Sequence, residues 1–202
     1  MKLAIAGSHG VGKTTLVNSL VQTLAVTPIN EVVREVAKVM EIDNCDSIKA
    51  GELETLRLFQ TKIFYQQLME EQELTDFISD RSIFDIVAYM EYYKLPADLV
   101  EEFAQYAIKH STTYDTIIYC PIPKGAELEA DGFRLVEGQK EYDLILKRLL
   151  FQAECRVVKL TRDRDQWVER VMAIAPVKKY LKARNRHEQG NSGRPFGTRS
   201  RG

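Results

Sequence analysis

Short continuous apolar runs alternate along this chain with longer stretches in which apolar residues recur at helical spacing. The runs predict strands at residues 2–6, 31–33, 77–80, 116–120 and 156–160. The longer stretches predict helices at 13–25, 34–40, 52–73, 82–93, 96–110 and 137–151, then a helix from about 163 that Pro176 interrupts and a short basic helix at 177–187. Alternating strands and helices predict an α/β fold, a parallel sheet with helices on both faces.

Several boundaries depend on weaker signals. Residues 27–30 contain a proline and break the pattern. Residues 31–33 are therefore taken as the end of a short second strand, and this boundary is the least certain one. The fifth strand is more polar than the others, which indicates an edge of the sheet. Residues 43–47 and 122–136 read as loops, the latter a mobile lid. Residues 190–202 are rich in Gly, Ser and Arg with little to bury, which is typical of disorder.

The composition narrows the class of protein. A chain of 202 residues with 45% hydrophobic content is enough for one compact domain, which we place at 1–175, followed by a basic C-terminal extension at 176–202. The net charge of −1 gives no reason to expect a nucleic acid or an anionic membrane as partner. The sequence shows no membrane-spanning run, no signal peptide and no metal-binding cysteine spacing, so we expect a cytoplasmic protein. The sequence leaves open whether the protein forms a homodimer.

A glycine-rich stretch between the first strand and the first helix carries the strongest chemical signal. Its order fits the G-x-x-x-x-G-K-[ST] phosphate-binding loop. The backbone N–H groups would cradle the phosphates of ATP, the Lys13 ammonium would reach the β- and γ-phosphates, and the Thr14 hydroxyl would ligate Mg²⁺. The residues predicted to bind ATP in this stretch are Gly7, Ser8, His9, Gly10, Val11, Gly12, Lys13, Thr14 and Thr15.

Phosphoryl transfer also needs a carboxylate near Mg²⁺ and cations that neutralise the charge of the phosphoryl group being transferred. Asp80 and Arg81 stand where the third strand ends, and sites in such sheets lie beyond the carboxyl ends of the strands. Asp80 is therefore a candidate for metal binding and Arg81 for gripping a phosphate. Arg134, in the glycine-bearing loop, would close over the phosphates, and Arg162, with Arg164, would line the nucleoside end of the ATP site.

A second group of residues would bind the acceptor. It comprises Glu31 and Arg34 after the second strand, and Arg57, Gln60 and Phe64 on one stripe of the 52–73 helix. A hydroxyl acceptor profits from a carboxylate base such as Glu31 or Asp80. A monophosphate is already nucleophilic and needs arginine clamps, which Arg34, Arg57 and Arg81 would supply. The spacing alone does not choose between the two acceptors.

These motifs together resemble the P-loop nucleoside and nucleotide kinases, and among them the thymidylate-kinase-like and ribosylnicotinamide-kinase-like members. The resemblance covers about residues 1–175 and uses the phosphate loop, Glu31-x-x-Arg34-Glu35, Phe59-Gln60, Asp80-Arg81-Ser82 and Asp131-Gly132-x-Arg134. It implies a three-layer sandwich, a five-stranded parallel sheet in the order 2-3-1-4-5 and a short lid. It also implies that Lys13, Asp80, Arg81 and Arg134 are catalytic, that Thr14 and Asp80 hold Mg²⁺, and that the second and third helices bind the acceptor.

The sequence therefore predicts an ATP- and Mg²⁺-dependent kinase, with a nucleoside monophosphate slightly preferred as acceptor. A nucleoside or ribosylnicotinamide hydroxyl is the alternative acceptor, because the lid shows one clear arginine where monophosphate kinases often have several. A GTPase switch is disfavoured, since no Asn-Lys-x-Asp motif occurs after a strand. An ATPase module that acts with a macromolecular partner is the remaining alternative, and the basic tail is its best support.

Overall fold

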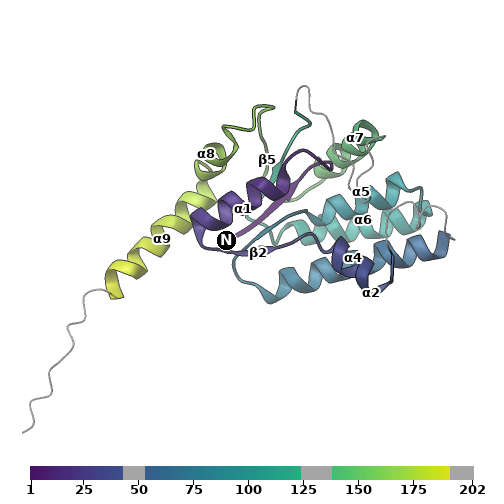
Figure 1. Ribbon diagram of the computed structural model, residues 1–202, viewed down its shortest axis with the longest axis horizontal. Helices are drawn as coiled ribbons and strands as arrows, with labels where there is room; N and C mark the ends of the chain where they lie inside the picture. The colour runs from purple at the N-terminus through teal and green to yellow at the C-terminus, as the bar shows by residue number, and fades with distance from the viewer. Residues whose placement is uncertain (43–52, 124–137, 192–202) are drawn as a thin grey trace, which may run out of the picture.

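The sheet at the centre of the molecule is five-stranded and entirely parallel, in the order β2-β3-β1-β4-β5 (Figure 1). The computed structural model describes residues 1–42, 53–123 and 138–191. The strands are β1 (Lys2–Ala6), β2 (Thr27–Ile29), β3 (Phe77–Ser79), β4 (Thr116–Tyr119) and β5 (Val157–Lys159). The predicted fold class and strand order are confirmed, and the more polar fifth strand lies at an edge as expected.

Helices cover both faces of this sheet. The helices of the described residues are α1 (Lys13–Leu24), α2 (Val33–Val39), α4 (Leu53–Glu73), α5 (Ile83–Tyr92), α6 (Ala97–Ser111), α7 (Gln139–Leu150), α8 (Trp167–Met172) and α9 (Ala175–Asn191). Figure 1 shows α1, α8 and α9 on one side and α2, α4, α5, α6 and α7 on the other. No helix of the described residues has the length and apolarity needed to cross a membrane.

The alternation of side chains along β1 divides the core in two. Leu3 and Ile5 point into the cluster that packs on α1, α8 and α9, whereas Ala4 and Ala6 point into the cluster on α4 to α7. All four side chains are fully buried. A strand buried on both faces is continuously apolar, which is why residues 3–6 contain no polar side chain.

The prediction for the second strand was wrong. The strand is β2, at Thr27–Ile29, and the residues expected to end it lead into α2, whose first residue is Val33. Pro28 has no N–H to donate to a ladder, so it argues against a central strand. However, β2 lies at the edge of the sheet and pairs with β3 alone, where a proline is tolerated.

The C-terminal helices also differ from the prediction. Helix α8 begins at Trp167, later than expected, and Pro176 does not interrupt it. Instead Pro176 stands in the first turn of α9, where a missing N–H costs nothing, and α9 continues to Asn191. Residues 190 and 191, expected to be disordered, therefore belong to a helix. The predicted loop at 43–47, most of the predicted lid with Arg134, and residues 192–202 lie outside the described residues.

Candidate active site

Three glycines of the loop between β1 and α1 have positive φ, namely Gly7, Gly10 and Gly12, and the first and last of them show why the motif requires glycine. Gly7 has φ 153°, and a Cβ there would come within 2.6 Å of the Cys120 carbonyl oxygen at the end of β4. Gly12 has φ 101° and directly precedes α1. Side chains rarely adopt such values, so the motif needs glycine at both positions. The loop thus lies against the carboxyl ends of the central strands, with the N-terminus of α1 behind it.

The loop lysine is folded back onto its own loop. The buried ammonium of Lys13 donates to the carbonyl oxygens of Gly7 and Ser8, both at 2.8 Å. Burial, together with the nearby positive charge of Arg81, lowers the pKa of Lys13. The Ser8 hydroxyl is buried with no hydrogen-bond partner among the described residues. The loop therefore holds a desolvated cation and an unused hydroxyl at the place where phosphates are expected.

Thr14 and Asp80 come together beyond the ends of the neighbouring strands β1 and β3. The Thr14 hydroxyl donates to Asp80 Oδ2 at 2.5 Å, although the two residues are 66 positions apart. Hydroxyl and carboxylate oxygens are ligands that Mg²⁺ accepts, and it usually takes one or two from protein beside phosphate and water. Both side chains line a cavity of about 230 Å³. Its lining consists of His9, Gly10, Gly12, Lys13, Thr14, Thr15, Glu31, Asp80, Arg81 and Arg164. We call this the phosphate cavity.

Arg81 is held in an unusual conformation and a strong ion pair. Its φ is 138°, a region that residues other than glycine rarely enter. Its Nε donates to Glu31 Oε1 at 2.8 Å, its Nη2 donates to the same oxygen, and its guanidinium carbon lies 5.1 Å from the centre of the Tyr89 ring. Backbone strain of this kind persists where the surrounding structure fixes it, and it concentrates at functional sites.

Glu31 and Arg81 shift each other's pKa. Burial alone would raise the pKa of Glu31, but the adjacent Arg81 outweighs it and lowers that pKa to about 2. Burial alone would lower the pKa of Arg81, but Glu31 outweighs it and raises that pKa. Both groups are therefore charged at neutral pH. Arg81 Nη1 is buried and has no hydrogen-bond partner among the described residues, which leaves one donor for an anionic ligand.

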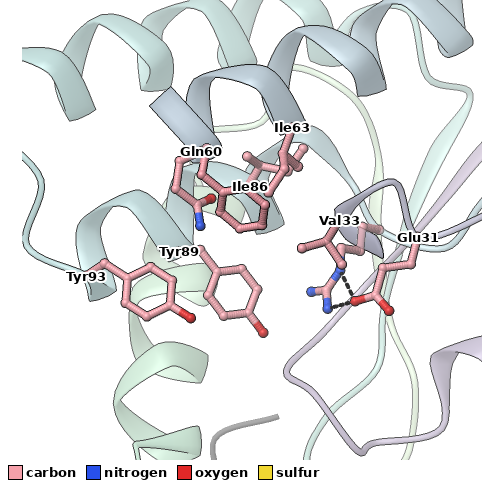
Figure 2. A pocket seen from close by; sticks show the side chains of 9 residues that line it. Glu31, Val33, Gln60, Ile63, Ile86, Tyr89 and Tyr93 are labelled. Carbon is pink, nitrogen blue, oxygen red and sulfur yellow. Dashed lines mark hydrogen bonds and ion pairs between the residues drawn. The ribbon is translucent and has the colours of Figure 1, made fainter. Parts of the chain in front are cut away.

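A second cavity lies on the other side of this ion pair (Figure 2). It measures about 30 Å³, and its lining consists of Glu31, Val33, Phe59, Gln60, Ile63, Arg81, Ile86, Tyr89 and Tyr93. Figure 2 shows Gln60 on α4, Tyr89 on α5 and Tyr93 just beyond the end of α5, with Glu31 across from them. Glu31 and Arg81 line both cavities, so the pair forms the wall that the two share. We call the second one the aromatic cavity.

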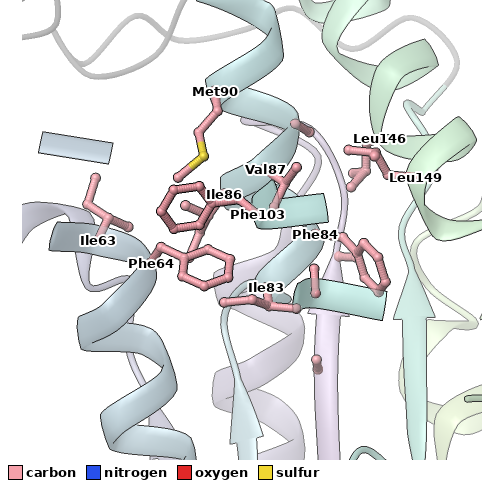
Figure 3. Close-up of a cluster of buried hydrophobic side chains, with 14 of the residues drawn as sticks. Ile63, Phe64, Ile83, Phe84, Ile86, Val87, Met90, Phe103, Leu146 and Leu149 are labelled. Carbon is pink, nitrogen blue, oxygen red and sulfur yellow. The ribbon is translucent and has the colours of Figure 1, made fainter. Parts of the chain in front are cut away.

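The structure separates the residues predicted to bind the acceptor. Glu31 and Gln60 line the aromatic cavity, and Arg34 lies beside it, with its Nε 3.8 Å from Glu31 Oε2 and its side chain half exposed. Phe64 instead packs in the core, its ring 4.5 Å from that of Phe103 (Figure 3). Arg57 is half exposed, pairs with Glu54 and lines neither cavity.

The residues predicted to bind ATP are also divided. Those of the loop line the phosphate cavity except Gly7, Ser8 and Val11, which are buried and do not line it. Arg162 lines a different cavity, with Tyr119, Pro121 and Lys159. Arg164, expected with it at the nucleoside end, lines the phosphate cavity, and its Nη2 donates to the Gly10 carbonyl oxygen at 3.2 Å.

Asp85 is a site residue that the sequence analysis missed. Its fully buried carboxylate accepts from the Gly7 N–H at 3.1 Å, from the Ser82 N–H at 2.9 Å and from the Ser82 hydroxyl at 2.6 Å. Tyr142, on α7, donates to its carbonyl and carboxylate oxygens. The signal was present, because Ser82-x-x-Asp85 is a capping-box pattern at the start of α5. Asp85 thus joins the phosphate loop to the loop that carries Arg81.

A buried polar network lies behind the same segment. Gln67 donates to the Ser79 hydroxyl at 2.7 Å, and Ser79 in turn donates to the Arg81 carbonyl oxygen at 2.8 Å. Glu71 accepts from Gln67 and from the Tyr114 hydroxyl, and its other oxygen lies 2.6 Å from His110 Nε2. These contacts fix the backbone of residues 79–81 from the core side, which accounts for the persistence of the strained φ at Arg81.

The Glu31–Arg81 pair predicts a dependence of stability on pH. The pKa of Glu31 is about 2 in the folded protein and 4.5 ordinarily. The unfolded chain therefore binds this proton more readily, so the pair stabilises the fold above pH 4.5 and that stabilisation is lost as the pH falls towards 2. A shift of this size corresponds to about 3 kcal/mol. Urea unfolding at pH 6, 4 and 3 measures it.

Glu31→Gln provides the control for that measurement. The glutamine cannot ionise, so the free energy of unfolding of the variant should fall less between pH 6 and pH 3 than that of the wild type. Other carboxylates titrate identically in both proteins and cancel in the comparison. Parallel curves for the two proteins would contradict the ion pair as described.

The sheet order, the phosphate loop at the end of β1 and the paired Thr14 and Asp80 define a P-loop nucleotide-binding protein with the fold of the P-loop kinases. The chain belongs to the AAA domain family, whose model matches residues 2–170. No match was found among curated proteins.

Three solved structures illustrate the likeness of fold. Deoxyadenosine kinase from M. mycoides with bound dATP is 16% identical, with a TM-score of 0.59 over 85% of this chain and 97% of that one. NadR in complex with NR is 23% identical, with a TM-score of 0.60 over 84% of this chain and 50% of that one. Shikimate kinase from Aquifex aeolicus vf5 is 13% identical, with a TM-score of 0.52 over 92% and 98%.

Proposed function

We propose that this protein is a kinase that transfers the γ-phosphoryl group of ATP to a hydroxyl group of a small nucleoside-like acceptor. The observation that carries the proposal is the wall shared by the two cavities, the Glu31–Arg81 ion pair. One side of it is a polar cavity built around the phosphate loop, and the other is a mostly apolar cavity with three aromatic rings and one amide. That arrangement suits a reaction between two bound substrates.

The donor half uses the loop as follows. The Lys13 ammonium would exchange its two carbonyl partners for the β- and γ-phosphate oxygens of ATP, and the loop N–H groups would hold the phosphates. Thr14 and Asp80 would hold Mg²⁺, which when bound neutralises phosphate charge. The spare Nη1 donor of Arg81 would bind the migrating phosphoryl group.

The acceptor half favours a hydroxyl over a phosphate. Arg81 is already paired with Glu31, Arg34 approaches the same carboxylate at 3.8 Å, and Arg57 lies away from the cavity. Among the described residues, little free positive charge is left to clamp a second phosphate. Glu31 is ionised at neutral pH and would orient an acceptor hydroxyl by accepting its hydrogen bond. Because its pKa is low, it would take the proton late, once bonding to phosphorus has made that oxygen strongly acidic. This reverses the slight preference of the sequence for a monophosphate.

The lining of the aromatic cavity indicates a planar acceptor. The Gln60 amide offers a donor and an acceptor to the edge of a base, and Tyr89 and Tyr93 offer ring faces. At about 30 Å³ the cavity is smaller than a nucleoside, so these side chains would move apart on binding. Deoxyadenosine and shikimate, after which two of the similar structures are named, carry hydroxyl groups and no phosphate.

An acceptor panel tests the proposal. Purified protein with ATP and Mg²⁺ is incubated with nucleosides, with the matching monophosphates, with ribosylnicotinamide and with no acceptor, and ADP release is measured. We expect at least one hydroxyl acceptor to raise ADP release about tenfold or more over the blank. Phosphorylation of monophosphates alone would overturn the hydroxyl assignment. No stimulation by any compound would overturn the kinase and favour an ATPase that needs a macromolecular partner.

A further inference from the structure

The charges of this chain are segregated in a way that its net charge of −1 conceals. Residues 175–202 hold eight of the 28 Lys and Arg residues and one of the 29 Asp and Glu residues. This leaves a net charge of +7 on that segment and −8 on residues 1–174. A near-neutral total therefore does not describe the field around α9, which is the helix that opens the segment.

Helix α9 is anchored by one face only. Val177 is fully buried in the cluster that packs on α1, Leu181 and Tyr180 are partly buried against the same cluster, and Arg184 donates to the Leu24 carbonyl oxygen at 2.6 Å. Figure 1 shows α9 running from α8 away from the sheet. The apolar side of the helix is thus used within the protein, which excludes the insertion of that side into a lipid surface.

The opposite face of α9 is cationic. It carries Lys178, Lys179, Lys182 and Arg186, which are all exposed and which share a shallow surface hollow with Ala175 and Ala183. None of the four cations forms an ion pair within the described part of the chain. Lys178, Lys182 and Arg186 follow one another at intervals of four, a spacing at which like charges destabilise a helix. We call these four residues the cationic face.

We propose that the cationic face of α9 binds the phosphodiester backbone of a nucleic acid. Residues 178 and 186 are eight apart, about 12 Å along the helix. Phosphates follow one another at about 3.4 Å per strand, so this length matches three to four of them, one for each cation. The small alanines between the cations let a strand approach closely.

Nucleic acid fits this surface better than an acidic protein does. The four cations are flexible or planar donors with no large apolar or aromatic residue in the hollow that they line, whereas protein interfaces usually place such anchors at their centre. A line of evenly spaced cations along a helix is the electrostatic footprint of backbone binding. The binding depends on charge and not on base sequence.

Fluorescence anisotropy of the full chain with labelled 20-nucleotide single-stranded RNA, single-stranded DNA and duplex DNA tests the proposal. We expect binding of at least one of them at 50 mM salt. For four neutralised phosphates, log K should fall against log salt with a slope of about −2.8 for a single strand or about −3.6 for duplex DNA. The variant K178Q/K179Q/K182Q/R186Q should bind at least about tenfold more weakly, with a flatter slope. The three probes distinguish RNA from DNA.

A matched variant controls for charge alone. K38Q/K62Q/K94Q/K109Q also removes four exposed cations, but from other helices and a turn, and it should bind nucleic acid as well as the wild type does. Circular dichroism confirms folding, and the double variant K178Q/K182Q replaces the fourfold one if its melting temperature falls. Equal affinity of wild type and cationic-face variant would overturn the proposal. So would equally tight binding of polyglutamate, which would indicate an acidic protein partner.

Discussion

Replacing Arg81 with alanine is expected to lower kcat at least about 100-fold. Arg81 lines both cavities, and its Nη1 is a buried donor without a partner among the described residues. A guanidinium placed on the migrating phosphoryl group stabilises charge that develops only in the transition state, so its loss acts on kcat more than on KM. Steady-state kinetics with the best acceptor of the panel measures the effect.

The Arg81→Ala experiment is compared with two further variants. Arg57→Ala removes a half-exposed arginine that lines neither cavity, and near-wild-type kcat is expected for it. Arg81→Lys keeps a charge but loses the planar fork that grips Glu31, so a large loss is expected there too. Thermal melting shows whether the alanine variant, which leaves Glu31 without its partner, is folded. A folded Arg81→Ala protein with normal turnover would contradict the role.

Replacing Lys13 with alanine is expected to lower kcat by at least about 100-fold as well. The ammonium is buried, and its carbonyl partners lie in the phosphate loop itself, so it is already positioned and stripped of water. A desolvated charge needs little reorganisation when phosphate oxygens replace those carbonyls. Single-turnover kinetics at saturating ATP separates the chemical step from ATP binding, which calorimetry measures independently.

Lys62→Ala is a suitable control for Lys13→Ala, because Lys62 is exposed on α4 and lines neither cavity. Its rate and ATP affinity should match those of the wild type. Loss of the two hydrogen bonds of Lys13 will also lower stability, so melting temperatures of all variants are compared. If Lys13→Ala binds ATP and reacts at the normal rate, the lysine has no part in phosphoryl transfer.

The residues of the phosphate cavity could be predicted because their signals are local. Residues 2–14 form a strand, a glycine turn and a helix start in direct succession, and each part is set by its own residues. Asp80 and Arg81 were placed by one further rule, that parallel strands end at the same edge of the sheet. The contact of Thr14 with Asp80 confirms that placement across 66 residues.

The aromatic cavity depends on packing between helices, which a single sequence does not reveal. Gln60 and Phe64 stand one turn apart on the same stripe of α4, yet Gln60 lines the aromatic cavity and Phe64 lies under Phe103 of α6. Tyr89 of α5 and Tyr93 just after it line the cavity because α5, which is buried on nearly all sides, places them there. In the sequence they look like ordinary tyrosines. The position of β2 could not be predicted either, because its proline is compatible with a strand only at the edge of a sheet, and the pairing with β3 alone shows that β2 lies there.

The carboxylate of Asp85 would couple the binding of the two substrates of the proposed kinase. It accepts from the N–H of Gly7 in the donor loop and from Ser82, the residue after Arg81 in the acceptor wall. A shift of either loop on binding is therefore transmitted to the other through one buried group. Linkage then requires that ATP change acceptor affinity by the same factor as the acceptor changes ATP affinity. Asp85→Asn, which keeps the shape of the side chain but weakens this link, should bring that factor closer to one.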